Sequence, residues 1–124
     1  MNSKVFMIVR ILLGLFVIAF GLNKFLDFIP MPEMSAEAGA YFEALSSTKT
    51  LVLVGIVEIV AGLALILNKY GSLMALILMS VAVNAVLFHT SLDPGGIGGA
   101  AALLILNIAV IIGYKDKYKD LLAG

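Results

Sequence analysis

Four long runs of apolar residues, separated by short polar segments, dominate the pattern of this sequence. We place these runs at residues of about 4–28, 49–68, 70–91 and 97–114. Each run is close to the roughly 20 residues that an α-helix needs to cross the hydrocarbon core of a bilayer. The pattern therefore predicts an all-α membrane protein, in which residues 1–124 form a single antiparallel bundle of four transmembrane helices.

The polar segments between the runs contain the residues that usually end helices. Pro30 and Pro32 follow the first run, and proline cannot continue a helix. Only the four residues NKYG, at positions 68–71, separate the second run from the third, and so short a turn makes two helices antiparallel neighbours. The segment DPGG, at positions 93–96, supplies the glycines and proline of the last turn.

The longest polar segment carries an apolar stripe of its own. Its members recur at helical spacing and are Met34, Ala38, Tyr41, Phe42 and Leu45. Ser35 and the acidic residues around it suit the first turn of a helix. We therefore expect a short amphipathic helix over residues 33–46, lying on the outer face of the bundle. Tyr41 and Phe42 would then belong either to a lid over the bundle or to a surface for substrate gating or partner contact.

Composition and charge indicate a membrane protein and limit the partners that we expect. The chain is 62% hydrophobic and 13% charged, against typical soluble values of about 45–50% and 25%. Its formal net charge is zero, so nucleic acid is not an expected partner. Membrane lipids, other membrane subunits or further copies of the chain are the partners that we expect.

The cationic residues are distributed unequally over the two sides of the predicted bundle. Two of the eight, Lys24 and Lys49, fall on the side of the amphipathic helix. The other six fall on the side of the chain termini and are Lys4, Arg10, Lys69, Lys115, Lys117 and Lys119. Because positive residues accumulate in cytoplasmic segments, this bias predicts a multi-pass protein of the cell membrane with cytoplasmic N- and C-termini.

Two of the runs carry charged residues on the same helix face as glycines. The stripe in the first run contains Arg10, Gly14, Val17, Gly21 and Lys24, and the stripe in the second contains Gly55, Glu58 and Gly62. Small residues let two membrane helices approach closely, so we expect these stripes to face each other and to bury Glu58.

A carboxylate in the middle of a membrane helix needs a partner, because its burial alone is costly. Side chains lean toward the N-terminus of their own helix, which directs Lys24 and Glu58 toward each other in antiparallel helices. The same lean directs Arg10 toward the cytoplasmic headgroups. We therefore predict that Lys24 is the partner of Glu58 and that Arg10 is a structural charge, with a role inside the bundle left open.

Polar residues in the last two helices complete the predicted interior. By helical rise, Glu58, Asn84 and Asn107 all lie within about 6 Å of the membrane midplane, which predicts one polar pocket shared with Lys24. We expect this pocket to open toward the outer side and to take a small amphiphile. In the alternative, each Asn only joins helices by hydrogen bonds, and the core is closed.

The lone His89 lies near the outer end of its helix and is either a hydrogen-bond donor for a quinone-type carbonyl or a structural residue. With no Cys and one His, the chain is not expected to hold a metal or a haem by itself. We assign no catalytic residue.

The same residues carry a resemblance to a known family. The segment RILLGLFVIAFGLNKF, residues 10–25, resembles the first helix of DoxX-type membrane proteins, and EIVAGLAL, residues 58–65, is similar to their second-helix pattern. The order of four helices, acidic outer loop and short inner turn extends the similarity along the whole chain. Arg10, Lys24 and Glu58 match the family pattern position by position, although the family gives none of them a firm catalytic role.

The resemblance implies two kinds of function. DoxX-type proteins and their relatives are associated with quinol oxidase and thiosulfate:quinone oxidoreductase subunits, and with oxidative-stress complexes. On that basis the chain would be an accessory or quinone-linked subunit of a redox complex in the bacterial inner membrane. Related four-helix families include membrane chaperones, so the alternative is an assembly factor or structural subunit without chemistry of its own. Whether the chain is an enzyme stays open.

Overall fold

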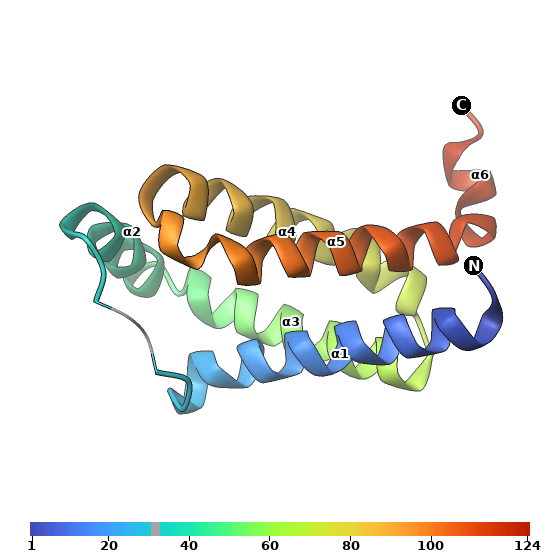
Figure 1. Ribbon diagram of the computed structural model, residues 1–124, viewed down its shortest axis with the longest axis horizontal. Helices are drawn as coiled ribbons and strands as arrows, with labels where there is room; N and C mark the ends of the chain where they lie inside the picture. Colours follow the sequence, from blue (N-terminus) through green and yellow to red (C-terminus); the bar gives the residue numbers. More distant parts are fainter. Residues whose placement is uncertain (31–32) are drawn as a thin grey trace.

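The computed structural model describes residues 1–30 and 33–124, and its regular elements are helices (Figure 1). These elements are α1 (Ser3–Leu26), α2 (Ala36–Ser47), α3 (Thr50–Leu67), α4 (Gly71–Leu92), α5 (Ile97–Gly113) and α6 (Lys119–Leu122), with short 3₁₀ turns η1 (Pro94–Gly96) and η2 (Lys115–Tyr118). The helices α1, α3, α4 and α5, the last together with η1, are long and apolar enough to cross a membrane. The predicted fold class, a four-helix membrane bundle with a short helix in the outer loop, is confirmed.

The four long helices lie side by side and alternate in direction (Figure 1). Helix α1 packs most closely against α3, and α4 packs most closely against α5. Helix α2 lies across one end of the bundle, whereas both chain termini lie at the opposite end. We refer to these as the α2 end and the terminal end.

Local capping sets the helix bounds, and two of them differ by more than one residue from those expected. Helix α1 ends before residue 28 because Asp27 adopts a left-handed conformation (φ 50°) and its N–H bonds to the Asn23 carbonyl. Pro32, which was also assigned to this helix end, lies outside the described residues. Helix α2 begins after residue 33 because Ser35 is its N-cap, and the Ser35 hydroxyl accepts a 3.2 Å hydrogen bond from the Ala38 N–H.

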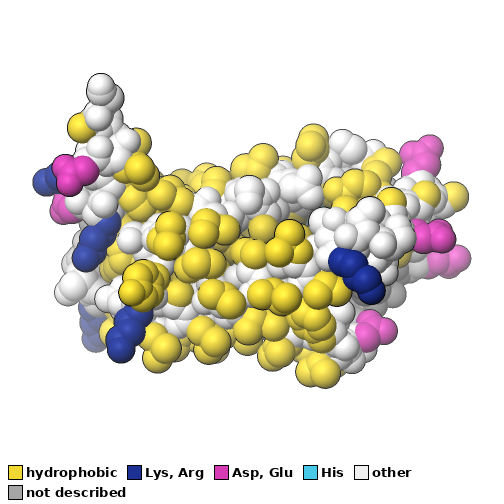
Figure 2. All heavy atoms as spheres, turned by 180° about the vertical axis from the view of Figure 1, so that it is seen from behind, with side chains coloured by type: hydrophobic (Ala, Val, Ile, Leu, Met, Phe, Trp, Pro, Cys, Tyr) yellow, Lys and Arg dark blue, Asp and Glu magenta, His cyan; other side chains and the backbone are white. Residues whose placement is uncertain are grey.

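The surface between the two ends of the bundle is apolar. Leu15, Leu63 and Ile105 are between 50% and 66% exposed, although each lies in the middle of a long helix. Figure 2 shows hydrophobic side chains along this band, with charged side chains gathered at the two ends. In water such a surface would promote association, whereas in a bilayer it faces lipid chains. The chain is therefore a multi-pass membrane protein whose long helices contact lipid.

Helices α1 and α3 approach so closely that their backbones touch. A Cβ atom added at Gly62 would lie 2.7 Å from the Gly14 carbonyl oxygen and 2.3 Å from the Ile18 Cγ1 atom. The carbonyl cannot rotate away as a flexible side chain would. Further along the same interface, a Cβ atom at Gly21 would lie 3.0 Å from the Gly55 carbonyl oxygen. The glycines of the two predicted stripes therefore do face each other.

Substitution of Gly62 by alanine should weaken the α1–α3 contact. We expect Gly62→Ala to lower the free energy of unfolding by about 1–3 kcal/mol, because the added methyl group overpacks against backbone. Thermal unfolding in detergent would measure the loss. Gly98→Ala is the matched control, since no described atom outside its chain neighbours and the nearby backbone of its own helix lies within 4 Å of a Cβ atom at Gly98. Equal melting temperatures for the two variants would contradict the backbone contact.

The arrangement of the ends can be tested by labelling. Ser46 lies in α2 and Ala123 follows α6, and both are exposed at opposite ends of the bundle. We expect Ser46→Cys and Ala123→Cys to react with a membrane-impermeant thiol reagent from opposite sides of sealed vesicles. The chain has no Cys of its own, so the unmodified protein is the background control. Labelling of both positions from the same side would refute the arrangement.

Candidate ligand pocket

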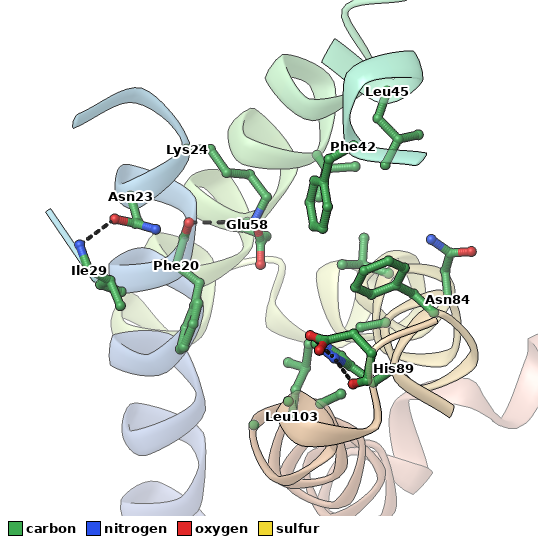
Figure 3. Close-up of a pocket in the computed structure, with 18 of the residues that line it drawn as sticks. Phe20, Asn23, Lys24, Ile29, Phe42, Leu45, Glu58, Asn84, His89 and Leu103 are labelled. Atoms are coloured by element: carbon green, nitrogen blue, oxygen red, sulfur yellow. Dashed lines mark hydrogen bonds and ion pairs between the residues drawn. The ribbon is translucent and has the colours of Figure 1, made fainter. Parts of the chain in front are cut away.

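A cavity of about 420 Å³ opens inside the bundle at the α2 end. Its walls come from α1, α3, α4 and α5, and α2 lies over it (Figure 3). The lining is mostly apolar and aromatic, and Phe20 and Phe42 are among its aromatic members. Its polar members include Lys24, Glu58, Asn84 and His89. Of the two alternatives for the interior, the structure has the pocket and not the closed core. Its volume falls within the roughly 300–1,000 Å³ of typical ligand sites.

Lys24 and Glu58 form an ion pair in the wall of this cavity. The Lys24 Nζ atom lies 2.5 Å from the Glu58 Oε1 atom, and the Glu58 side chain is only 4% exposed. Figure 3 shows the two side chains extending toward each other from α1 and α3. The prediction that Lys24 is the partner of Glu58 is confirmed. The cause is the one expected: in antiparallel helices, side chains that lean toward their own N-termini converge.

Arg10 is also buried, which corrects the expectation that it extends to the headgroups. Only 8% of Arg10 is exposed, and its Nη1 atom donates to the carbonyls of Leu65 and Ile66. The last carbonyls of a helix have no partner within that helix. Because α3 ends beside the start of α1, those carbonyls are within reach of Arg10, and the guanidinium is bound there inside the bundle.

Two tyrosines join the chain segments of the terminal end. The Tyr114 hydroxyl donates to Asn68 Oδ1 at 2.6 Å, and the Tyr118 hydroxyl donates to the Ser72 carbonyl at 2.7 Å. Burial, with a smaller effect of neighbouring Tyr114, raises the pKa of Tyr118 to about 12. The Tyr118 hydroxyl therefore stays protonated at physiological pH and keeps its role as donor. Together with Arg10, these contacts close the terminal end.

The two asparagines do not share the pocket, which corrects a second expectation. Asn84 lines the cavity, and its Nδ2 atom donates to the Tyr41 hydroxyl at 3.3 Å. Asn107 is fully buried, lies outside the cavity lining and donates to the Ala75 carbonyl at 3.0 Å. Helical rise gives the depth of a residue but not the direction in which its face points. Asn107 points at α4 and joins α5 to that helix.

His89 lies in the pocket wall across from the Lys24–Glu58 pair (Figure 3). Its Nδ1 atom is 3.2 Å from Asp93 Oδ2 and 3.0 Å from the Asp93 carbonyl oxygen. These contacts fix the orientation of the ring and leave Nε2 without a hydrogen-bond partner among the described residues. Gly96 lies directly against the ring, since a Cβ atom there would be 2.4 Å from His89 Cε1. Asp93 and Gly96 therefore position His89.

Helix α2 covers the pocket through aromatic contacts. The ring of Tyr41 stacks on Phe88 at a centroid distance of 5.1 Å and an interplanar angle of 20°. Phe42 meets the same ring edge-on at 5.0 Å, and in Figure 3 its side chain points from α2 toward the cavity. Tyr41 and Phe42 thus lie where a lid would place them. Contact of either residue with another protein stays a prediction.

Sequence reasoning missed several residues of this site. Phe20 and Phe88 form apolar walls, but nothing distinguishes them from other aromatic residues of the membrane runs. Asn23 also lines the cavity, and its Oδ1 atom accepts a 2.7 Å hydrogen bond from the Ile29 N–H after the end of α1. The sequence pattern predicts Asp93 only as a turn residue. Its spacing of four residues from His89 could have indicated the pair.

The fold and the pocket define a small four-helix integral membrane protein with a ligand-sized cavity inside its bundle. The family model called DoxX matches residues 5–91, from α1 to the last turns of α4. The match covers well over half of the 124 residues, and the chain belongs to the DoxX family. It includes Lys24, Glu58, Asn84 and His89. Comparison with curated proteins and with solved structures found no significant match in either.

The Lys24–Glu58 pair should show strong coupling in a double-mutant cycle. Lys24→Met or Glu58→Leu alone leaves a charge unpaired in an apolar wall, and we expect each to cost up to about 3 kcal/mol of stability. The double variant removes both charges and should recover most of this loss. Glu58→Gln should be milder than Glu58→Leu, because the amide keeps a hydrogen bond.

Thermal unfolding in detergent would provide these values, with the exposed Glu37→Gln on α2 as the control. Additive losses in the double variant would mean that the two charges do not depend on each other in the folded protein.

Proposed function

We propose that this protein is a quinone-binding accessory subunit of a membrane redox complex. The observation that carries the proposal is the cavity at the α2 end, which combines aromatic walls with hydrogen-bonding groups on two opposite sides. Membership of the DoxX family supports a membrane role. The resemblance to quinone-linked members of the family suggests the ligand.

The pocket matches the shape of a quinone head group. A quinone ring is flat and apolar on its faces, and rings such as Phe20, Phe42 and Phe88 offer surfaces on which it can lie. A cavity of about 420 Å³ has room for such a ring and for the beginning of a tail. A compact charged metabolite would find few partners in these walls.

The polar groups match the two oxygens of a quinone, which lie at opposite ends of its ring. An ammonium group has three hydrogens, and the Lys24 ammonium is 2.5 Å from Glu58 and 3.5 Å from the Phe20 carbonyl. It can direct a further hydrogen to a ligand oxygen. Across the cavity, the His89 Nδ1–H donates to Asp93, which leaves Nε2 for the second oxygen: Nε2 donates to a quinone carbonyl when the ring is doubly protonated, and it accepts from a quinol hydroxyl when it is not. Lys24 and His89 would thus bind opposite ends of the same ring.

In this proposal the quinone supplies the redox chemistry, and the chain binds and orients it. The described residues contain no group of three or more His, Cys, Asp or Glu side chains placed to hold a metal ion. We therefore assign the electron-transfer partner of the quinone to a cofactor on another subunit. Lys24, Glu58 and His89 have binding roles here, and the hydrophobic walls keep water from the ring.

The proposal includes a cellular setting. We place the protein in the bacterial inner membrane, with the terminal end in the cytoplasm and the α2 end on the outer side. Six of the eight Lys and Arg residues support this orientation. Glu33, Glu37 and Glu43 belong to the opposite side, in keeping with the same rule. The pocket would then lie in the outer half of the membrane.

The alternative function is an assembly factor or structural subunit. One observation favours it: Lys24 and Glu58 satisfy each other without any ligand, as a pair that serves only the fold would. On this alternative, the cavity would be filled by lipid chains, and α2 would be a contact for other membrane proteins. Ligand binding separates the two functions.

Binding of a tail-less benzoquinone analogue tests the proposal. We expect saturable binding to the protein in nanodiscs by isothermal titration calorimetry. His89→Phe should weaken this binding about tenfold, the effect of one lost hydrogen bond of about 1.4 kcal/mol, because the ring volume stays while the Nε2–H donor of the doubly protonated imidazole beside Asp93 is removed. Thr90→Val is the control, since the Thr90 hydroxyl bonds only within α4, to the Leu87 carbonyl.

Two outcomes would count against the quinone pocket. Absence of saturable binding by the unmodified protein would favour the assembly-factor alternative. Binding that is unchanged in both His89→Phe and Lys24→Met would place the ligand elsewhere on the protein. Mass spectrometry of lipids that co-purify with the protein would identify any native quinone independently.

A further inference from the structure

The pocket at the α2 end has a side that faces the lipid, between α1 and α5. These two helices meet at the terminal end, where the rings of Phe6 and Tyr114 contact edge-on at a centroid distance of 4.9 Å. Toward the α2 end, the cavity separates Phe16 and Phe20 of α1 from Gly99 of α5, and all three line it. The α1–α5 seam is therefore closed at one end of the bundle and hollow at the other.

Gly99 lies on the rim of this hollow. It lines the cavity and is exposed. Apart from its chain neighbours and the nearby backbone of its own helix, no heavy atom of the described residues lies within 4 Å of the position that a Cβ atom would take. Across the seam, Phe20 also lines the cavity and is 37% exposed. Exposed residues therefore line the cavity on both sides of the α1–α5 seam.

The walls of this seam are apolar, in contrast to the interior of the pocket. Phe16, Phe20 and Leu103 line the cavity on this side, whereas Lys24 and His89 belong to the last turns of α1 and α4, toward the α2 end, and Glu58 is buried. The route under α2 is crossed by the stacked Tyr41 and Phe88 rings and by the hydrogen bond from Asn84 to Tyr41. A flexible hydrocarbon chain that left through the α1–α5 seam would thus pass only apolar side chains. A chain that left under α2 would instead meet the layer of aromatic rings.

We propose that the α1–α5 seam at Gly99 is a lateral portal, through which the apolar chain of the bound ligand extends into the membrane. This inference rests on the proposed quinone pocket and specifies its ligand: a membrane-dissolved amphiphile with a flat polar head and one long apolar tail. The head lies between the Lys24–Glu58 pair and His89, and the tail leaves between Phe20 and Gly99. Glycine at position 99 keeps the portal open, because a larger side chain would occupy it.

Filling the portal should discriminate between ligands with and without a tail. We expect Gly99→Phe to weaken binding of a quinone with a long isoprenoid tail by at least about tenfold, equivalent to 1.4 kcal/mol. Binding of the tail-less analogue should change by less than about twofold, because Lys24 and His89, the groups that bond to the head, are unchanged. Gly99→Leu is a second, smaller variant and should give an intermediate loss.

Gly98→Phe is the matched control. Gly98 also has open space around its Cβ position, but it does not line the cavity, so neither ligand should bind differently. Both affinities would be measured in the same nanodiscs, and thermal unfolding would establish that each variant is folded.

Each result has a distinct meaning. Unchanged affinity of Gly99→Phe for the tailed quinone would refute the portal and direct the tail toward α2, while the quinone pocket stands. Equal loss for both ligands in the folded variant would show that position 99 belongs to the head-group site, which also refutes the portal. If the unmodified protein binds neither ligand, the quinone pocket itself is wrong, and the portal falls with it.

Discussion

The backbone contact between α1 and α3 determines which polar groups of the two helices meet and, with them, the shape of the cavity. Gly14 and Gly62 bring the two helices together where any side chain would hold them apart. At that separation, Lys24 reaches Glu58 on one side of the contact, and Arg10 reaches the last carbonyls of α3 on the other. Helices α4 and α5 form a second pair, joined by Asn107. The cavity is the space left between these two pairs at the α2 end, so its shape depends on how firmly each pair is closed.

The two cations that α1 directs into the bundle, buried Arg10 and half-buried Lys24, are satisfied in different ways, and the difference bears on function. Arg10 bonds to backbone carbonyls, which are fixed by the helix that carries them. Lys24 bonds chiefly to a carboxylate on a side chain, which can rotate and share its partner with a third group. An interaction of the first kind holds the bundle together but cannot respond to a ligand. The second kind can adjust, and it is the one in the cavity wall. The structure thus separates a rigid end from an adaptable one.

More of the fold than of the candidate site could be predicted from the sequence. Helix number, the α2 stripe and the pairing of Lys24 with Glu58 followed from periodicity and side-chain direction, because both are local properties of a helix. Asn107 and Arg10 were misplaced for a common reason: their positions depend on which neighbouring helix each face meets. For Arg10 the decisive fact is where α3 ends, and for Asn107 it is the rotation of α5 against α4. The aromatic walls were equally hidden, since Phe20 and Phe88 have no distinguishing spacing.

Arg10 and Lys24 also bear on how the protein is made. The groups that satisfy both cations lie mainly in α3, which leaves the ribosome after α1 and the whole outer loop. A lone α1 in lipid would carry two unpaired charges, each costing less than the roughly 2.5–3.5 kcal/mol of a charge at the centre of a membrane helix, since Lys24 lies in the last turn of α1 and Arg10 in its first half. The apolar residues of α1 offset this cost, but α1 becomes most stable in the membrane only when α3 packs beside it and satisfies the two charges. Helix α1, the first to be synthesised, would thus depend on α3, the second membrane span, for its polar partners. The two helices would therefore enter the bilayer as a pair.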